Sequence, residues 1–147
     1  QKLPGVKLTI IGKNPPKDFL KLASEEASGI VTTGFVPELD PYFAKAAVSI
    51  VPVRAGGGMR VRILEMFARA APVVTTTVGL EGIDACPGED VLVADSPEDF
   101  AKSVIHLLQD EHLQQKLSTN GRQLVEKKYD WQAVLGELDR VYQGLAR

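Results

Sequence analysis

A run of three glycines, followed by two arginines and a glutamate, is the part of this sequence best suited to binding an anion. The residues are Gly56, Gly57, Gly58, Arg60, Arg62 and Glu65. A turn without Cβ atoms lets the main chain come within hydrogen-bonding reach of a ligand. Free N–H groups at the start of a following helix, with the positive end of its dipole, favour a phosphate. The spacing therefore predicts a phosphate site.

The elements around the turn place this site at the end of a strand. Residues 48–53 are a short, β-branched apolar run, which is typical of a buried strand in a parallel sheet. Residues 59–69 have helical periodicity and leave one narrow polar stripe. The stripe consists of Gly58, Arg62, Glu65 and Arg69. An alternative interpretation is a solvated helix face on which Glu65 pairs with Arg69, a pair worth about 0.2–0.5 kcal/mol.

The segment 52–76 also resembles a known family motif. It reads P-V-R-A-G-G-G-M-R-V-R-I-L-E-M-F-A-R-A-A-P-V-V-T-T, and it is similar to the nucleotide-sugar-binding motif of retaining GT-B glycosyltransferases, the group of glycogen synthase and sucrose synthase relatives. A glutamate at the position of Glu65 binds the ribose hydroxyls in that family. Many members carry a second glutamate, which contacts the donor sugar, where this chain has Gly57. Ala71 replaces the usual glycine before Pro72.

The resemblance implies a role for each part of the site. Glu65 would hold the ribose, and the main-chain amides around Gly57 to Val61 would hold the diphosphate. The expected donor-binding loop comprises Gly56, Gly57, Gly58, Met59, Arg60 and Val61. Arg60 or Arg62 would act as the catalytic residue by offsetting charge on the leaving phosphate, and Arg62 matches a basic position of the family better. No metal and no cofactor besides the nucleotide-sugar donor is implied.

A second part of the nucleotide site is expected at Gly34 and Val36. These residues form a G-x-V at the end of a predicted strand, and the family places the base there through main-chain atoms. Phe35 between them is at least as well explained as core lining. The loop 76–82 leaves the same edge of the sheet, where open α/β sheets bind ligands. Glu81 in this loop is a weak candidate for a ligand contact, and its interpretation as a solvated surface charge is favoured.

Strand and helix patterns alternate along the chain, which predicts a single Rossmann-like α/β domain, residues 1–147, with a doubly wound parallel sheet. About five strands are expected, at residues 7–11, 30–33, 48–53, 73–75 and 91–94. Helices are expected at residues 18–27, 37–47, 59–69, 111–128 and 131–145, and another opens at Ser96 and Pro97. Asp40 is a plausible cap for the second helix. The two last helices should pack through their apolar faces.

The resemblance covers nearly the whole chain and implies the C-terminal half of a GT-B enzyme. The family's strand order is 3-2-1-4-5-6, and its first strand would precede the segment 1–5. A central strand is therefore expected to be missing between residues 7–11 and 48–51. Either the natural protein continues upstream of Gln1, or these two segments pair directly, or the chain associates with another chain. A separate N-terminal domain would carry the acceptor site.

Composition and charge exclude several classes of protein. The chain of 147 residues is 44% hydrophobic and has a net charge of -2. It lacks the basic patch of a nucleic-acid-binding protein. Cys86 is the only cysteine, so no internal disulfide forms, and a buried or idle thiol in a cytoplasmic protein is expected. No segment is apolar enough to span a membrane, although missing parts could bring the protein to a membrane surface. His106 and His112 lack partners at metal-ligand spacing.

These features predict the donor-binding domain of a nucleotide-sugar-dependent glycosyltransferase that retains anomeric configuration, inactive without its partner domain. Two other classes are considered. A dinucleotide-binding dehydrogenase would need G-x-G-x-x-G, but Val61 stands at the last position of that motif, so this alternative is weak. A noncatalytic nucleotide-binding or interaction domain on the same fold stays open, because a fold does not fix a function.

Overall fold

The structure is a computed structural model that describes residues 3–25 and 28–145. For residues 137–141, 144 and 145 only the backbone is described. The chain forms two compact units, Gln1–Ala44 and Lys45–Arg147. Each unit is described by itself below.

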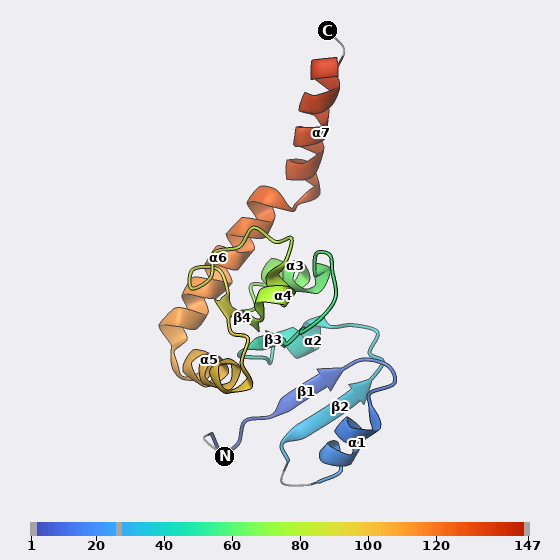
Figure 1. Cartoon of the computed structure of the whole chain (residues 1–147), viewed down its shortest axis with the longest axis vertical. Coiled ribbons are helices and arrows are strands. Elements are labelled where there is room, and N and C mark those ends of the chain that lie inside the picture. The colour runs from blue at the N-terminus through green and yellow to red at the C-terminus, as the bar shows by residue number, and fades with distance from the viewer. Residues whose placement is uncertain (1–2, 26–27, 146–147) are drawn as a thin grey trace. The chain divides into compact units, whose positions relative to one another are not determined.

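The first unit is a strand–helix–strand segment followed by one helical turn. Its elements are β1 (Leu8–Ile11), α1 (Lys17–Ala23), β2 (Ile30–Gly34) and α2 (Asp40–Phe43). The two strands are parallel, with Leu8 opposite Ile30 and a register irregularity after Ile10. Helix α1 lies against β2, as the right-handed crossover of parallel strands requires (Figure 1).

The second unit holds the remaining strands and the long helices. Its elements are β3 (Ser49–Val51), α3 (Val61–Ala68), β4 (Val73–Thr75), α4 (Thr77–Leu80), β5 (Leu92–Val93), α5 (Pro97–Gln109), α6 (Glu111–Lys128) and α7 (Trp131–Leu145). The strands form a parallel sheet in the order β3-β4-β5. Ser49 lies opposite Val73, and Val74 opposite Leu92.

The core of the second unit lies between the sheet and helices α3, α5 and α6. Val74, Leu107 and Leu117 are fully buried and pack together at its centre. Helix α3 contributes Ile63 and Phe67, which are also fully buried. Helix α6 packs against both α3 and α5 (Figure 1). The charged face of α3 is thereby left outside the core.

The five parallel strands confirm the predicted Rossmann-like α/β fold. Strand β4 and helices α6 and α7 have the predicted bounds. Ser96 caps α5 as expected, because its hydroxyl accepts a hydrogen bond from the Asp99 amide. These elements have strong local signals, since a cap and an apolar period act within a few residues.

Several predicted boundaries were wrong. Residues 77–80, expected in a loop, form α4, because the Thr76 hydroxyl caps this turn by accepting from the Gly79 amide. Helix α2 has only four residues, and its N-cap is Leu39 instead of Asp40. Helix α3 begins two residues later than predicted, after the turn at Gly58, whose φ of 87° is not helical.

Direct pairing of residues 7–11 with 48–51, one of three alternatives for the predicted gap, would join the two units. Strand β1 pairs with β2 and strand β3 with β4, in two separate sheets. Because each unit is described by itself, direct pairing of β1 with β3 stays a prediction. Residues 1 and 2, where an upstream continuation would attach, lie outside the described residues.

The described apolar side chains of α7 are not buried as the sequence predicts, and the side chains of Leu138, Val141 and Leu145 lie outside the described part of the chain. Trp131 is 77% exposed and Tyr142 is 63% exposed, and Val134 and Leu135 are about half exposed. Within the described residues α6 is the main neighbour of α7, and it does not cover these side chains. The helical period is correct, but a period gives the apolar face and not the element that covers it.

Candidate functional site

The glycine loop between β3 and α3 is open on the side of its central residues. Gly56 and Gly58 have positive φ angles of 117° and 87°, a conformation that favours glycine. A Cβ atom added at Gly57 or Gly58 would meet no atom within 4 Å. Main-chain atoms of this loop are therefore accessible to a ligand.

The Arg60 side chain binds carbonyl groups of the loop. Its Nη1 donates hydrogen bonds to the carbonyl oxygens of Gly57 and Gly58, both at 2.7 Å. Its own carbonyl accepts from the Ile63 amide at 2.8 Å, so Arg60 is also the N-cap residue of α3. The predicted phosphate-binding arginine is thus held against the main chain of the loop in this structure.

Helix α3 starts directly after the loop and has no side-chain cap. No described side chain accepts a hydrogen bond from its first amides. The Ile63 amide donates to the Arg60 carbonyl, and the N–H groups of Val61 and Arg62 are left available. Arg62 and Glu65 are exposed on this helix, whereas Ile63, Met66 and Phe67 are buried. The loop, the helix start and the charged stripe therefore lie on one segment.

The Glu65 carboxylate makes no hydrogen bond or ion pair with any residue that the structure describes. Arg69, the alternative partner, donates from Nη1 to the backbone carbonyl of Glu65 at 3.1 Å. The Glu65 side chain is exposed. A carboxylate in this position is available for an external hydroxyl group.

Two threonines fasten the carboxyl ends of β3 and β4 beside the loop. The Thr75 hydroxyl donates to the Val51 carbonyl at 3.0 Å, and both groups are buried. The Thr76 hydroxyl donates to the Val53 carbonyl and accepts from the Gly79 amide. Sequence analysis missed these contacts, because a Thr-Thr pair after a strand gives no signal of a partner more than twenty positions away.

The segment after α4 reaches Met59, which lies between the three glycines and α3. A Cβ atom at Gly82, whose φ is 79°, would lie 3.3 Å from the Cβ atom of Met59. Gly82 therefore allows close approach to the residue that follows the glycine loop. Glu81, the weaker candidate contact, is exposed at the C-cap position of α4.

Asp95, after β5, anchors the start of α4. Its two carboxylate oxygens accept hydrogen bonds from the Thr77 amide, at 2.8 Å, and from the Thr77 hydroxyl, at 2.7 Å. The hydroxyl bond, then the amide bond, and to a lesser extent the positive charge of Arg54, lower the pKa of Asp95 below its ordinary value of 3.8. Sequence analysis did not single out this residue.

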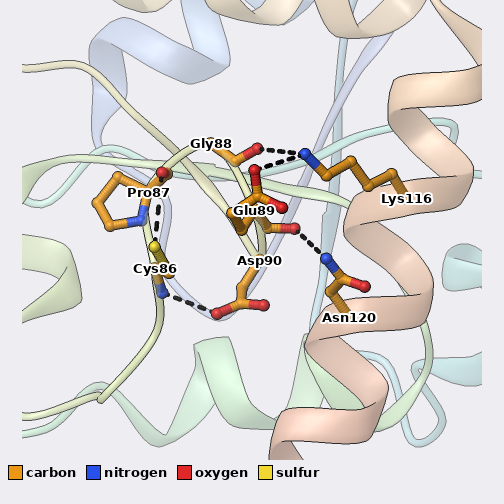
Figure 2. Close-up of polar contacts among 7 residues, drawn as sticks. All are labelled: Cys86, Pro87, Gly88, Glu89, Asp90, Lys116 and Asn120. Atoms are coloured by element: carbon orange, nitrogen blue, oxygen red, sulfur yellow. Dashed lines mark hydrogen bonds and ion pairs between the residues drawn. The ribbon is translucent and has the colours of Figure 1, made fainter.

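A separate loop is tied to α6 by polar contacts (Figure 2). Lys116 donates to the carbonyl of Gly88 at 3.2 Å and pairs with Glu89 at 2.7 Å, while Asn120 donates to the Glu89 carbonyl at 2.8 Å. The Cys86 amide donates to Asp90 at 2.7 Å across the loop. These contacts keep the connection from α4 to β5 on the surface of α6.

An open cleft of about 640 Å³ lies between this loop and α6. Asp84 and Lys128 pair at its edge, and this hydrogen bond with its charge attraction lowers the pKa of Asp84. The glycine loop does not line this cleft. The cleft residues are Asp84, Ala85, Cys86, Pro87, Asp90, Asn120, Gln123, Leu124, Lys127 and Lys128.

The residues expected at the nucleotide base belong to the first unit. Gly34 ends β2 with a φ of 69°, and Val36 follows two residues later. Phe35 is 67% exposed, so its interpretation as core lining was wrong. Its ring lies 4.5 Å from the ammonium group of Lys13, a cation–π contact. Gly34 and Val36 thus lie in the first unit, and the glycine loop lies in the second.

The remaining polar candidates give no further site. Cys86 is exposed, not buried. The His106 imidazole lies 3.6 Å from Asp110 one helical turn later. Among the described residues, no three His, Cys, Asp or Glu side chains gather where they could hold a metal ion. No described helix combines the length and apolar character of a membrane span.

Most of the chain matches the model of one protein family. Residues 1–110 match the family described as "Glycosyl transferases group 1". A relative from Klebsiella pneumoniae, named "Uncharacterized 44.6 kDa protein in cps region", is 26% identical over 141 residues. This match covers 92% of the chain and 36% of that protein. The chain therefore spans about a third of the length of this relative.

Solved structures show the same fold. A sucrose-phosphate synthase from Thermosynechococcus elongatus has a TM-score of 0.80 at 22% identity, with 98% of this chain and 39% of the synthase covered. The Anabaena protein HepE, solved in complex with UDP, has a TM-score of 0.78 at 14% identity, with 98% and 42% covered. Both likenesses establish the architecture of the chain.

Proposed function

The chain belongs to the glycosyl transferases group 1 family, and on that premise we propose that it is the donor-binding domain of a GT-B glycosyltransferase. The observation that carries the proposal is the open glycine loop followed by the uncapped start of α3. Together they offer main-chain amides and a helix dipole to a diphosphate. A sugar would pass from a nucleoside diphosphate to an acceptor, with retention of anomeric configuration.

The charged stripe of α3 supplies the other groups that this reaction needs. Glu65, exposed and unpaired among the described residues, would accept hydrogen bonds from the ribose hydroxyls. Negative charge builds on the leaving phosphate as the glycosidic bond breaks, and a fixed cation nearby stabilises that transition state. Arg62, exposed one residue inside the helix, and Arg60, beside the loop, are the proposed sources of this charge.

The similarity to HepE, which was solved in complex with UDP and also with UDP-glucose, supports a nucleotide-sugar donor. The matched proteins are more than twice as long as this chain, since it covers 39% of the synthase and 42% of HepE. We therefore place the acceptor site on a separate N-terminal domain and propose that the chain alone does not transfer sugar. No metal takes part in this proposal.

Titration calorimetry on the full-length protein tests the proposal. UDP, GDP, ADP and UDP-glucose are compared with NAD at the same ionic strength. We expect at least one of the nucleoside diphosphates to bind and NAD not to bind. Binding confined to NAD would contradict the proposal. Binding of none of these ligands would favour a noncatalytic interaction domain.

Replacing Gly57 with glutamate is expected to change donor-sugar preference while leaving the affinity for bare UDP within about twofold. Gly57 lacks a positive φ, and an added Cβ atom has open space, so the backbone tolerates the substitution. Surface substitutions of this kind change stability by about 0.5 kcal/mol or less. Competition between UDP-glucose and UDP-N-acetylglucosamine measures the preference.

Gly58→Glu is the matched control for this substitution. The space around Gly58 is equally open, but its φ of 87° strains any residue with a side chain. We expect the control to weaken UDP binding, because the strain shifts the loop. An equal loss of UDP affinity in Gly57→Glu would show that position 57 also needs glycine.

A further inference from the structure

Arg60 holds the glycine loop by its carbonyl groups. One nitrogen, Nη1, donates to both the Gly57 and the Gly58 carbonyl at 2.7 Å. Hydrogen bonds from a charged donor are roughly twice as strong as those between neutral groups. Two successive peptide planes of the loop are therefore fixed by one side chain.

The orientation of these carbonyls determines where the neighbouring amides point. All described peptide bonds are trans. In a trans peptide, the carbonyl of one residue and the N–H of the next point in opposite directions. With the Gly57 and Gly58 carbonyls directed at Arg60, the N–H groups of Gly58 and Met59 are directed away from it. Successive N–H groups that face one side form an anion-binding concavity.

The same arrangement keeps an unfavourable charge out of the site. A carbonyl oxygen carries partial negative charge and would repel a phosphate on the ligand side of the loop. Arg60 binds both oxygens on its own side. Gly56, whose φ of 117° already favours glycine, also lies close to this side chain, because a Cβ atom there would be 3.0 Å from Arg60 Nη2.

We propose that Arg60 is a positioning residue that presents the amides of Gly58 and Met59 to the diphosphate. Arg62 is then the arginine that contacts the ligand directly. This inference rests on the proposed function, which supplies the diphosphate. It gives the two arginines different roles, whereas the sequence analysis named both as candidates for offsetting phosphate charge and favoured Arg62.

The first test measures the loop of the full-length protein without ligand. Backbone ¹⁵N order parameters of Gly57 and Gly58 are expected to fall from about 0.85 to below about 0.6 in Arg60→Ala, the range of a flexible backbone. Arg62→Ala is the matched control, because its guanidinium makes no hydrogen bond to the loop in the described residues. Unchanged order parameters in Arg60→Ala would overturn the proposal.

The second test measures UDP affinity by calorimetry in the same variants. The UDP affinity of Arg60→Ala is expected to be about tenfold lower, which corresponds to the lower end of the free energy of one charged hydrogen bond. Arg60→Lys should recover part of this loss, because an ammonium group can still reach a carbonyl. A loss in Arg60→Ala with a rigid loop would identify Arg60 as a direct ligand and overturn the proposal.

A double-substitution comparison tests the link to Gly56. Gly56→Ala and Gly58→Ala both place a side chain at positive φ, but only the former meets the Arg60 guanidinium. The loss of UDP affinity caused by Gly56→Ala should be smaller in Arg60→Ala than in the unsubstituted protein, because the guanidinium that the new side chain meets is gone. An equal loss in both backgrounds would contradict the proposed contact. If the unsubstituted protein binds no nucleotide, the proposed function fails, while the order parameters still decide the role of Arg60.

Discussion

Glu65→Gln is expected to weaken the binding of the nucleoside diphosphate by about 10- to 150-fold and to leave thermal unfolding unchanged. The factor corresponds to one charge-assisted hydrogen bond of about 1.5–3 kcal/mol. Stability should not change because the Glu65 side chain is exposed and makes no hydrogen bond or ion pair with a described residue. Glutamine keeps the size and helix propensity of the side chain, so only the charge is removed.

Calorimetry with UDP and a thermal scan of the full-length protein separate these two effects. Glu81→Gln is the control, since Glu81 is an exposed carboxylate at the C-cap of α4, on a neighbouring segment. We expect its UDP affinity to change by no more than about twofold, the effect of a screened surface charge. If Glu65→Gln bound UDP normally, or if its unfolding temperature dropped sharply, Glu65 would be a structural residue of the helix face.

The sequence predicts the elements whose signals are local. Helix α5 has a cap and a proline at its start, α6 a cap and α7 its apolar period, and β4 is a short buried run. Helix α4 was missed because its four residues do not carry enough period to be detected. It forms through distant groups: the Thr76 hydroxyl reaches Val53, and Thr77 reaches Asp95. Contacts of this kind depend on strand order, which a local pattern does not contain.

At the candidate site the residues were predicted, but a local contact among them was missed. The glycine run and the polar stripe of α3 follow from composition and helical spacing, and the structure keeps Arg62 and Glu65 exposed there. The contact of Arg60 with the loop carbonyls was not predicted, because an arginine beside a predicted phosphate site was assigned to the ligand. The exposure of Phe35 was also missed, since an aromatic residue between apolar neighbours favours a core position.

Gly121→Ala is expected to destabilise the protein, whereas Gly136→Ala should leave it unchanged or slightly more stable. Both glycines lie inside helices, so alanine gains about 1 kcal/mol of helix propensity at each. A Cβ atom at Gly121 would lie 2.7 Å from the Phe67 ring, whereas one at Gly136 meets nothing within 4 Å. Overpacking of a core costs about 1–3 kcal/mol.

The difference in unfolding free energy between these two variants therefore isolates the contact between α6 and α3. Urea unfolding measures it, and equal free energies in both variants would show that the Phe67 ring can move aside. The ring is fully buried, which argues against such a movement. Arg122, the next residue of α6, donates to the Ala68 carbonyl at the end of α3. Because α6 holds the helix that carries Glu65, Gly121→Ala should also weaken UDP binding, and Gly136→Ala should not.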